Sequence, residues 1–343
     1  MRSVLCPLIV ALSVMACARR APPSRITDTA SGAPRTIAPD RPPPAIQAAS
    51  DGSPTKAEFR NVDFHVGSGI VLRIHFLRGR MRSKSPGEPV DFDHKDSFVI
   101  DIQSAEVGLT MADLDHLMNG YVFAYRGAPL RNLHFATQGA QLVQRGILHK
   151  VVDIPFQITA SMSVTPTGRI RIHPTAIRIF DVDGEGLMQA LGITLQRLLD
   201  VRQAKGVGVE GNDLLLNPDS LLPPPAITGR VTEVRIARGQ VVQIFGDTAA
   251  WVASHVQPLV PLDSAAPNYM RFQGGTLRFG KLFMVQADME IIDVQPGDAF
   301  DFSIDEYNRQ LVAGYSRNTP AKGLKVYMPD LDKVAAPSAA HHQ

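Results

Sequence analysis

Cysteine is nearly absent from this sequence. Its 343 residues include only two cysteines, Cys6 and Cys17, and both lie close to the first residue. Any folded part beyond them has no thiol, which excludes disulfide bonds, cysteine-ligated zinc and a cysteine nucleophile there. Such a part must be stabilised by its own core, and about 270 residues are enough to form one.

An excess of charge of one sign is also missing. Lysine and arginine number 35 and aspartate and glutamate 33, which gives a formal net charge of +2. Binding to nucleic acid requires a concentrated basic surface that neutralises phosphates. The near balance of charge therefore predicts that nucleic acid is not a partner.

The sequence begins with an apolar run that is too short to cross a bilayer. Arg2 provides a positive charge, and Val4 to Val14 is apolar apart from Pro7 and Ser13. A membrane-spanning helix needs about 20 apolar residues. A basic start followed by an apolar stretch of roughly 7–15 residues is instead typical of a secretory signal. We therefore expect the protein to be exported.

The end of this run resembles the lipobox of bacterial lipoproteins. It reads Val14-Met15-Ala16-Cys17, and a lipobox is cleaved before a cysteine that then carries lipid. The resemblance implies a signal peptide at residues 1–16, a membrane anchor at Cys17 and a place in the bacterial cell envelope, facing the periplasm. The residue after Cys17 is Ala18 and not an aspartate, which favours the outer membrane. The alternative is an ordinary signal peptide that ends near a cysteine by chance.

Composition divides the rest of the chain into a tether, a folded part and a tail. Residues 17–55 contain eight prolines among small and polar residues, a composition that buries little apolar surface and predicts a disordered tether. Residues 335–343 are predicted to be a disordered tail. Between them we expect one domain over residues 56–250, with a β-rich extension of the same domain over residues 251–334.

Alternating apolar and polar residues predict many β-strands in the folded part. The clearest case runs from Ile154 to Val164, where every second residue is apolar. This period of two is typical of a sheet with one apolar and one polar face. A return strand follows from Ile170 to Ile179, and its alternation slips near His173-Pro174. The slip predicts a β-bulge.

Two helices are expected between the strands. Thr110 and Asp113 have the spacing of a capping box, and an apolar stripe follows at Leu114, Leu117, Met118, Tyr121 and Val122. The stripe has the spacing of one helix face.

The second helix is expected from about Glu185 to Val201 and to end before Gly206. Leucines at positions 187, 191, 195 and 198 share one of its faces.

Motifs for chemistry are incomplete. Gly275 to Lys281 fits the first seven positions of a phosphate-binding loop, but Leu282 replaces the required serine or threonine, and the segment alternates like a strand. We predict no enzyme, no catalytic residue, no metal and no cofactor. A hydrolase that uses Asp298, Asp301 and Glu306 is a further hypothesis, and it requires these three carboxylates to share one deep cleft.

The segment from about Asp96 to Gly246 resembles one module of the tubular lipid-binding proteins, the TULIP-like relatives of the bactericidal/permeability-increasing protein. The order of strands and helices carries the resemblance, together with five short segments: Ile154-Pro155-Phe156, Gly168 to Ile172, Gly186-Leu187 with Leu191-Gly192, Gly211 to Pro218, and Leu221 to Pro225. The resemblance covers under half of the chain and does not extend beyond Trp251.

This resemblance implies an α+β fold and a function. In such proteins a strongly curved antiparallel β-sheet wraps around one long helix, with a second helix, and the half-barrel leaves an apolar groove for acyl chains. We therefore expect a non-catalytic envelope lipoprotein that binds or transfers a phospholipid or another acyl-chain lipid. The alternative function is a structural or assembly protein of the envelope that binds another protein through the groove or a sheet edge.

Apolar residues of the predicted strands and helices are the candidates for the groove lining. They are Leu117, Met118, Tyr121, Phe156, Ile158, Met162, Leu191 and Leu195. For any one of them the alternative is a place in a closed core, because most large apolar residues are buried for packing.

Overall fold

The computed structural model describes residues 52–67, 69–150, 152–179, 182–183, 194–246 and 258–335. Of these residues, 54% lie in strands and 12% in helices. The predicted signal peptide, Cys17 and most of the predicted tether lie outside them. Within the described ranges, no helix is long and apolar enough to cross a membrane.

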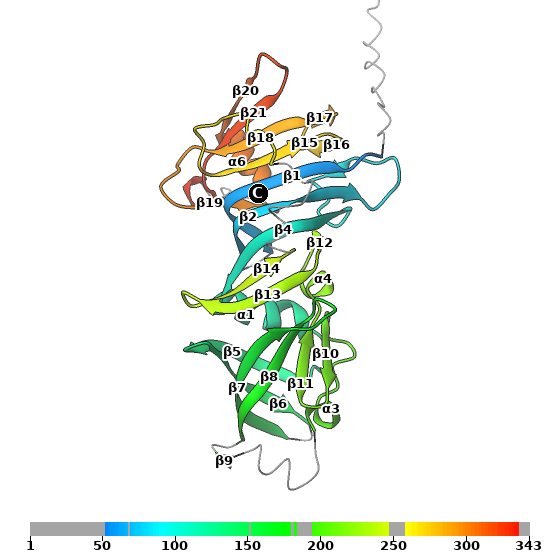
Figure 1. Cartoon of the computed structure of the whole chain (residues 1–343), viewed down its shortest axis with the longest axis vertical. Helices are drawn as coiled ribbons and strands as arrows, with labels where there is room; N and C mark the ends of the chain where they lie inside the picture. The colour runs from blue at the N-terminus through cyan, green and yellow to red at the C-terminus, as the bar shows by residue number, and fades with distance from the viewer. Residues whose placement is uncertain are drawn as a thin grey trace, which may run out of the picture. The chain divides into compact units, whose positions relative to one another are not determined.

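The largest sheet has eleven strands. Its order is β13-β14-β4-β2-β1-β15-β18-β21-β20, with β12 beside β4 and β19 beside β1 (Figure 1). We call it the large sheet. Its strands are β1 (Thr55–Gly67), β2 (Ile70–Ser83), β4 (Phe98–Thr110), β12 (Ala226–Thr228), β13 (Val231–Ala237), β14 (Gln240–Phe245), β15 (Tyr269–Gln273), β18 (Asp288–Asp293), β19 (Phe300–Ser303), β20 (Tyr315–Asn318) and β21 (Leu324–Met328).

A second sheet has seven strands in the order β10-β11-β8-β7-β6-β5, with β9 beside β8. Its strands are β5 (Leu130–Gln138), β6 (Gln141–His149), β7 (Asp153–Val164), β8 (Ile170–Ile179), β9 (Val182–Asp183), β10 (Val207–Glu210) and β11 (Asp213–Leu216). We call it the second sheet. A small sheet contains β3 (Val90–Asp91), β16 (Thr276–Phe279) and β17 (Leu282–Val285), with β16 in the middle.

The described helices are all short. They are α1 (Met111–Leu117), the π-helix η1 (Met118–Val122), α3 (Leu195–Leu198), α4 (Pro218–Leu221), α6 (Tyr307–Ala313) and the 3-10 helix η2 (Leu331–Lys333).

The predicted α+β half-barrel is wrong. The described residues are mostly β in several sheets, with no long helix and no strongly curved sheet wrapped around one. The first helix is α1 extended only by the π-helical turn η1. The second, expected from Glu185 to Val201, appears in the described residues only as the four-residue α3, while residues 184–193 lie outside them. The resemblance rested on the order of elements, which does not determine how strands pair across the chain.

Local predictions are confirmed. Thr110 caps α1 through a capping box in which its side chain and that of Asp113 each accept a backbone N–H. Pro174 of β8 pairs with Ala160 of β7, and Ala176 pairs with the next residue of β7, Thr159. The extra residue in β8 between these two pairs forms the predicted bulge. The candidate phosphate loop is instead the β16–β17 hairpin.

The large sheet joins the first described strand to the last ones. The first half of β1 pairs with β15 in antiparallel fashion and its second half with β19 in parallel. The predicted boundary at residue 250 lies within 247–257, outside the described residues. One cluster of buried apolar residues runs through the large sheet and the second sheet, from Phe59 on β1 to Leu214 on β11.

Candidate functional site

An apolar pocket lies where the large sheet, the second sheet and α1 meet. Twenty-four of its twenty-five lining residues are apolar, and Gln243 on β14 is the exception. Each of these three elements contributes to the lining: the large sheet through residues such as Phe64 on β1, the second sheet through residues such as Ile172 on β8, and α1 through residues such as Leu117. The pocket has a volume of about 60 Å³, and we call it the inner pocket. Such a lining excludes polar ligands, because a buried polar group without a partner is costly.

A second apolar pocket lies between the second sheet and α3. Leu195, Leu198 and Leu199 cover it from α3 and its C-cap, and Gln144 is the one polar residue among its twelve lining residues. Its volume is about 40 Å³. We call it the α3 pocket.

Both pockets lie against the same face of the second sheet. On β7, Ile154, Phe156 and Ile158 line the α3 pocket, and Met162 lines the inner pocket. All four positions have the same parity, so their side chains point to one face of the strand. On β11, Leu214 and Leu216 divide between the two pockets in the same way. The pockets are therefore two parts of one apolar face.

Two β-bulges keep this face continuous. On β8, Ile172 lines the inner pocket and Ile177 the α3 pocket, although five residues separate them and strict alternation would put them on opposite faces. The bulge after Pro174 restores the phase. On β5, a register shift between Arg131 and His134 does the same for Leu130 and Phe135; both strands thus turn their apolar side chains to the pockets.

The position of α1 is determined by a buried carboxylate. Asp113 accepts hydrogen bonds from the backbone N–H groups of Thr110 at 2.7 Å and Val71 at 3.2 Å. It also forms an ion pair with Arg73 on β2. These contacts hold the start of α1 against β2, and the helix then presents Leu114 and Leu117 to the inner pocket.

The structure brings six of the predicted groove residues to the two pockets. Leu117, Met118 and Met162 line the inner pocket, whereas Phe156, Ile158 and Leu195 line the α3 pocket.

Tyr121 lies apart from the lining of both pockets. It is half-buried against the core, and the Nζ atom of Lys205 lies 3.8 Å from the centre of its ring. The other two predicted site residues, Leu191 and Cys17, are outside the described residues.

Sequence reasoning missed the contribution of the large sheet to the inner pocket. Phe59 and Phe64 on β1, Leu72 and Ile74 on β2, and Val241 on β14 line it as well. Their alternation predicts strands, but which strands enclose a common interior depends on pairing between distant segments. No signal in the sequence identifies these residues as pocket lining.

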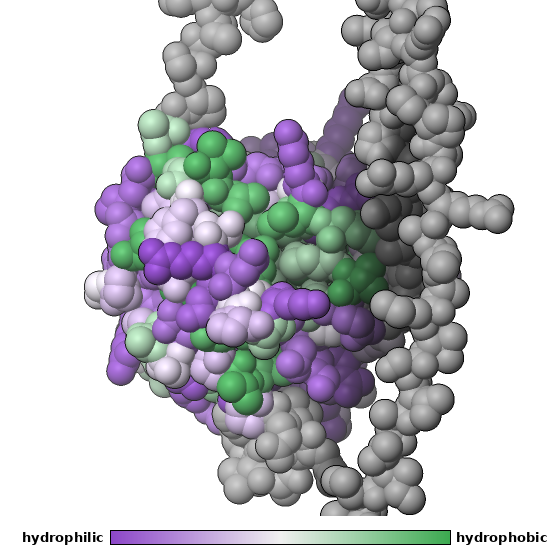
Figure 2. All heavy atoms as spheres, turned by 90° about the horizontal axis from the view of Figure 1, so that it is seen from above, coloured by the Kyte–Doolittle hydropathy of each residue, from purple (hydrophilic) through white to green (hydrophobic). Residues whose placement is uncertain are grey.

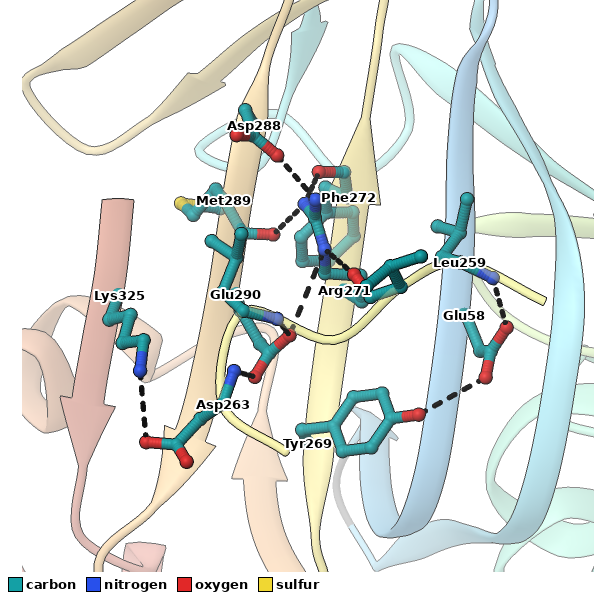
Figure 3. A network of polar contacts seen from close by, with 12 residues as sticks. Glu58, Leu259, Asp263, Tyr269, Arg271, Phe272, Asp288, Met289, Glu290 and Lys325 are labelled. Carbon is teal, nitrogen blue, oxygen red and sulfur yellow. Dashed lines mark hydrogen bonds and ion pairs between the residues drawn. The ribbon is translucent and has the colours of Figure 1, made fainter. Parts of the chain in front are cut away.

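A network of buried charges in the C-terminal part is a second candidate site. Arg271 on β15 is 2% exposed and Glu290 on β18 is fully buried, and the two lie 3.7 Å apart (Figure 3). Glu290 accepts the backbone N–H groups of Leu262 at 2.6 Å and Asp263 at 3.0 Å. Arg271 donates to the Val260 carbonyl at 3.1 Å. Burial raises the pKa of Glu290.

This network fastens segment 258–263 onto the large sheet. Glu58 on β1 accepts the Leu259 N–H at 3.0 Å and the Tyr269 hydroxyl at 3.1 Å (Figure 3). Lys325 on β21 pairs with Asp263 at 3.2 Å. Each of these polar groups has a partner within the chain. The contacts within the chain therefore explain why the groups are buried, and the network serves to attach the segment to the sheet.

Two of the three carboxylates of the hydrolase hypothesis have separate partners. Asp301 pairs with His65, and Glu306 pairs with Arg309 on α6. At Asp298 it is the backbone carbonyl that accepts a hydrogen bond, from the Asn61 side chain at 3.3 Å. Among the described residues, no group of three or more His, Cys, Asp or Glu side chains has the arrangement of a metal site.

Asp330 is a buried carboxyl close to Asp298 and Asp301. It is 4% exposed and accepts the Asp301 N–H at 2.8 Å. Burial is the main reason why its pKa is raised to about 6; the hydrogen bond from Asp301 acts against this rise, and the nearby carboxylates of Asp293, Asp298 and Asp301 add to it.

The raised pKa of Asp330 predicts a pH-dependent stability. An unfolded aspartate has a pKa near 3.9, so between about pH 4 and pH 6 the folded state binds more protons than the unfolded state. Stability should therefore fall as pH rises through this window. Asp330→Asn keeps an oxygen acceptor and removes the charge. We expect it to be more stable than wild type at pH 7.5, on the order of 1–2 kcal/mol after solvent screening, and equal to it near pH 4.

Urea denaturation at pH 4 and pH 7.5 measures this difference. Asp332→Asn is the matched control, because Asp332 is an exposed neighbour on η2 and its replacement should leave the pH dependence unchanged. A destabilised Asp330→Asn variant with the pH dependence of wild type would contradict the assignment.

Exposed apolar residues are scattered, with one local concentration. Figure 2, which shows the molecule from above, has several separate apolar patches with hydrophilic residues between them. On β17, an edge strand of the small sheet, Leu282 is 37%, Phe283 39% and Val285 46% exposed. An exposed apolar edge strand is a feature that proteins usually avoid unless a partner covers it.

Comparison with known proteins gives no relative: no family model, no curated protein and no solved structure matches the chain.

Proposed function

We propose that this protein is a membrane-anchored lipoprotein of the bacterial envelope that binds or transfers an acyl-chain lipid. The observation that carries the proposal is the continuous apolar face of the second sheet, with the inner pocket and the α3 pocket along it. The lipid is cargo, and the proposal assigns no reaction to the protein. The proposal retains the function implied by the resemblance to tubular lipid-binding proteins, and it does not retain their fold.

The chemistry of the lining supports an acyl chain as ligand. Only Gln243 and Gln144 are polar among the residues that line the two pockets. Burying a methylene group in such surroundings contributes about 0.8 kcal/mol, and a lipid chain supplies many of them in a row. A linear chain also matches pockets that follow one another along the strands.

The inner pocket must widen to take a long chain. Its 60 Å³ holds about four water-sized groups on the usual scale of cavity volumes. Met118 and Met162 are in its lining, and methionine is the apolar residue that repacks most easily because its side chain is unbranched and flexible. We expect these two side chains to move apart when a chain enters.

The test is photolabelling with a fatty acid that carries a diazirine in its chain. The probe is added to membranes from bacteria that produce the full chain, the sample is irradiated, and the protein is then purified. The proposal predicts labelling that saturates and that an excess of unlabelled fatty acid suppresses. Labelling that rises in proportion to probe concentration and resists competition would refute it.

The alternative function is binding of another envelope protein. The exposed apolar strand β17 favours it, because an edge strand can add a strand from a partner. Its signature in vivo is a crosslink from position 283 to a second protein, in cells where the fatty-acid probe does not label the chain. A saturable fatty-acid label with no such crosslink contradicts this alternative.

A further inference from the structure

Gln144 on β6 is a buried polar side chain in an apolar pocket. It is 4% exposed, and it is the one polar residue among the twelve that line the α3 pocket. Within the ranges that the structure describes, its amide has no hydrogen-bond partner. Because Gln144 lines the free space of the pocket, a ligand can reach this amide. Buried side-chain amides nearly always have a partner, and one without a partner costs stability.

A second buried glutamine shows how the chain pairs such an amide elsewhere. Gln310 on α6 is fully buried, and its amide nitrogen donates to the carbonyl oxygens of Asp301 at 2.7 Å and Pro329 at 2.9 Å. Its amide oxygen accepts the Ser303 N–H at 3.0 Å. No contact of this kind forms at Gln144 within the described part of the chain. The unpaired amide of Gln144 therefore indicates a partner from outside the chain.

Gln144 lies at the boundary between the two apolar pockets. On β6, Leu142 lines the inner pocket and Leu148 lines the α3 pocket. Both share the face of Gln144, because the three positions have the same parity. Across the sheet, Gln144 pairs with Phe135 of β5, which lines the inner pocket, and with Ile158 of β7, which lines the α3 pocket. A chain that lies along the apolar face must therefore pass this amide.

The surroundings of the amide decide which polar group it can bind. A buried water needs about two to four polar partners, and the other lining residues of the α3 pocket are apolar. An anion needs a cation, because an unpaired buried charge is costly, and none of the described lining residues carries a positive charge. The partner must therefore be an uncharged polar group whose own chain fills the apolar space.

From this position we infer that Gln144 binds an uncharged hydroxyl group of the acyl-chain lipid at the boundary between the two pockets. A primary amide both donates and accepts hydrogen bonds, and a hydroxyl does the same. An ester or ether oxygen only accepts, so it would leave the amide oxygen of Gln144 without a partner. The inference rests on the proposed function, and it adds the class of lipid and the residue that selects it.

The test compares three probes with the same number of non-hydrogen atoms. Decan-1-ol donates and accepts hydrogen bonds, 1-methoxynonane only accepts them, and undecane does neither. Each probe is delivered from a cyclodextrin and competes with the neutral dye 1-aminoanthracene on the full chain, which an amphipathic polymer keeps in solution. The readout is the ratio of the dissociation constants of two probes, compared between wild type and variant. The hydrophobicity of each probe and its affinity for cyclodextrin cancel in this comparison.

The altered protein is Gln144→Met, which removes the amide and keeps the length of the side chain. Its matched control is Gln141→Met, because Gln141 lies on the same strand and the opposite face, where it donates to Thr175 at 3.0 Å. Without a probe, Gln144→Met should unfold at a higher temperature than wild type, because an apolar group replaces an unpaired buried amide. Gln141→Met should not gain stability, because it loses a hydrogen bond.

We expect the preference for decan-1-ol over undecane to fall about 5- to 100-fold in Gln144→Met. This is the range for a hydrogen bond to a buried group that is otherwise unpaired. The preference for decan-1-ol over 1-methoxynonane should fall about threefold or more, because the variant no longer has an acceptor for the hydroxyl. In Gln141→Met neither preference should change by more than about twofold.

The outcomes separate this inference from the proposed function. A preference for decan-1-ol that is the same in wild type and Gln144→Met would overturn the hydroxyl site and leave acyl-chain binding intact. An equal loss for decan-1-ol and 1-methoxynonane would assign the site to an ester or ether oxygen and also overturn the inference. A Gln144→Met variant less stable than wild type would show that the amide has a partner within the chain, which removes the basis of the inference. Failure of every alkyl probe to displace the dye would refute the proposed function itself.

Discussion

Met162→Trp is expected to weaken acyl-chain binding about 10- to 100-fold. Met162 lies on β7 at the point where the apolar face passes from the α3 pocket into the inner pocket, and it is half-buried there. An indole at this position occupies much of the 60 Å³ that the inner pocket offers. Excluding two or three methylenes of a ligand removes roughly 0.8 kcal/mol for each of them, and this loss lies within that range in affinity.

The fold should tolerate this change. Overpacking of a core typically costs about 1–3 kcal/mol, and the existing cavity absorbs part of the added volume. Met284→Trp is the matched control, because Met284 on β17 is half-buried and outside both apolar pockets. Both variants gain one indole, so their optical changes are alike. Fluorescence titration with a fatty-acid probe measures the affinity. Equal losses in the two variants would mean that the chain does not pass Met162.

Arg271→Ala is expected to lower the free energy of unfolding by about 3–5 kcal/mol. The substitution leaves Glu290 fully buried without its cation, and removing one partner of a buried ion pair typically costs this much. It also removes the donors to the carbonyl groups of Val260 and Met289. Urea denaturation followed by circular dichroism gives the free energy.

A second substitution identifies the cause of this loss. Arg271→Ala/Glu290→Gln removes the unpaired charge and should recover about half of the lost stability, because the remaining penalty is lost hydrogen bonds. Arg317→Ala, which removes an exposed arginine of β20, should change stability by less than about 1 kcal/mol. A loss in Arg271→Ala no larger than in Arg317→Ala would show that the network does not hold segment 258–263 in place.

The local features of the fold could be predicted from the sequence. The capping box at Thr110 and Asp113 depends on residues three positions apart. The bulge in β8 was visible as a slip of the alternation near Pro174. Such features are determined by neighbouring residues, whose spacing the sequence displays directly.

Strand pairing across the chain could not be predicted. Lys56 on β1 pairs with Gln273 on β15, and no turn or spacing links two residues so far apart. The predicted half-barrel failed for this reason, since it took the order of elements as a guide to how they pack. The periodic leucines predicted as one long helix include Leu195 and Leu198, which form only one turn in α3. Apolar periodicity shows which side chains are buried and does not show what lies opposite them.

The same limit explains which part of the candidate site was found. Phe156, Ile158 and Met162 follow from the alternation of a single strand, and they do line the two apolar pockets. Phe64 on β1 and Ile74 on β2 line the inner pocket from the large sheet. These contributions arise only when distant segments come together.

The position of the photolabel on the chain tests the central claim most directly. After irradiation with the diazirine fatty acid, the purified full chain is digested and the labelled peptides are identified by mass spectrometry. Binding along the apolar face predicts labels on β7 between Phe156 and Met162 and on α1 near Leu117, and none on β17. Labels confined to the exposed strand at Phe283, or spread evenly over the surface, would contradict the account.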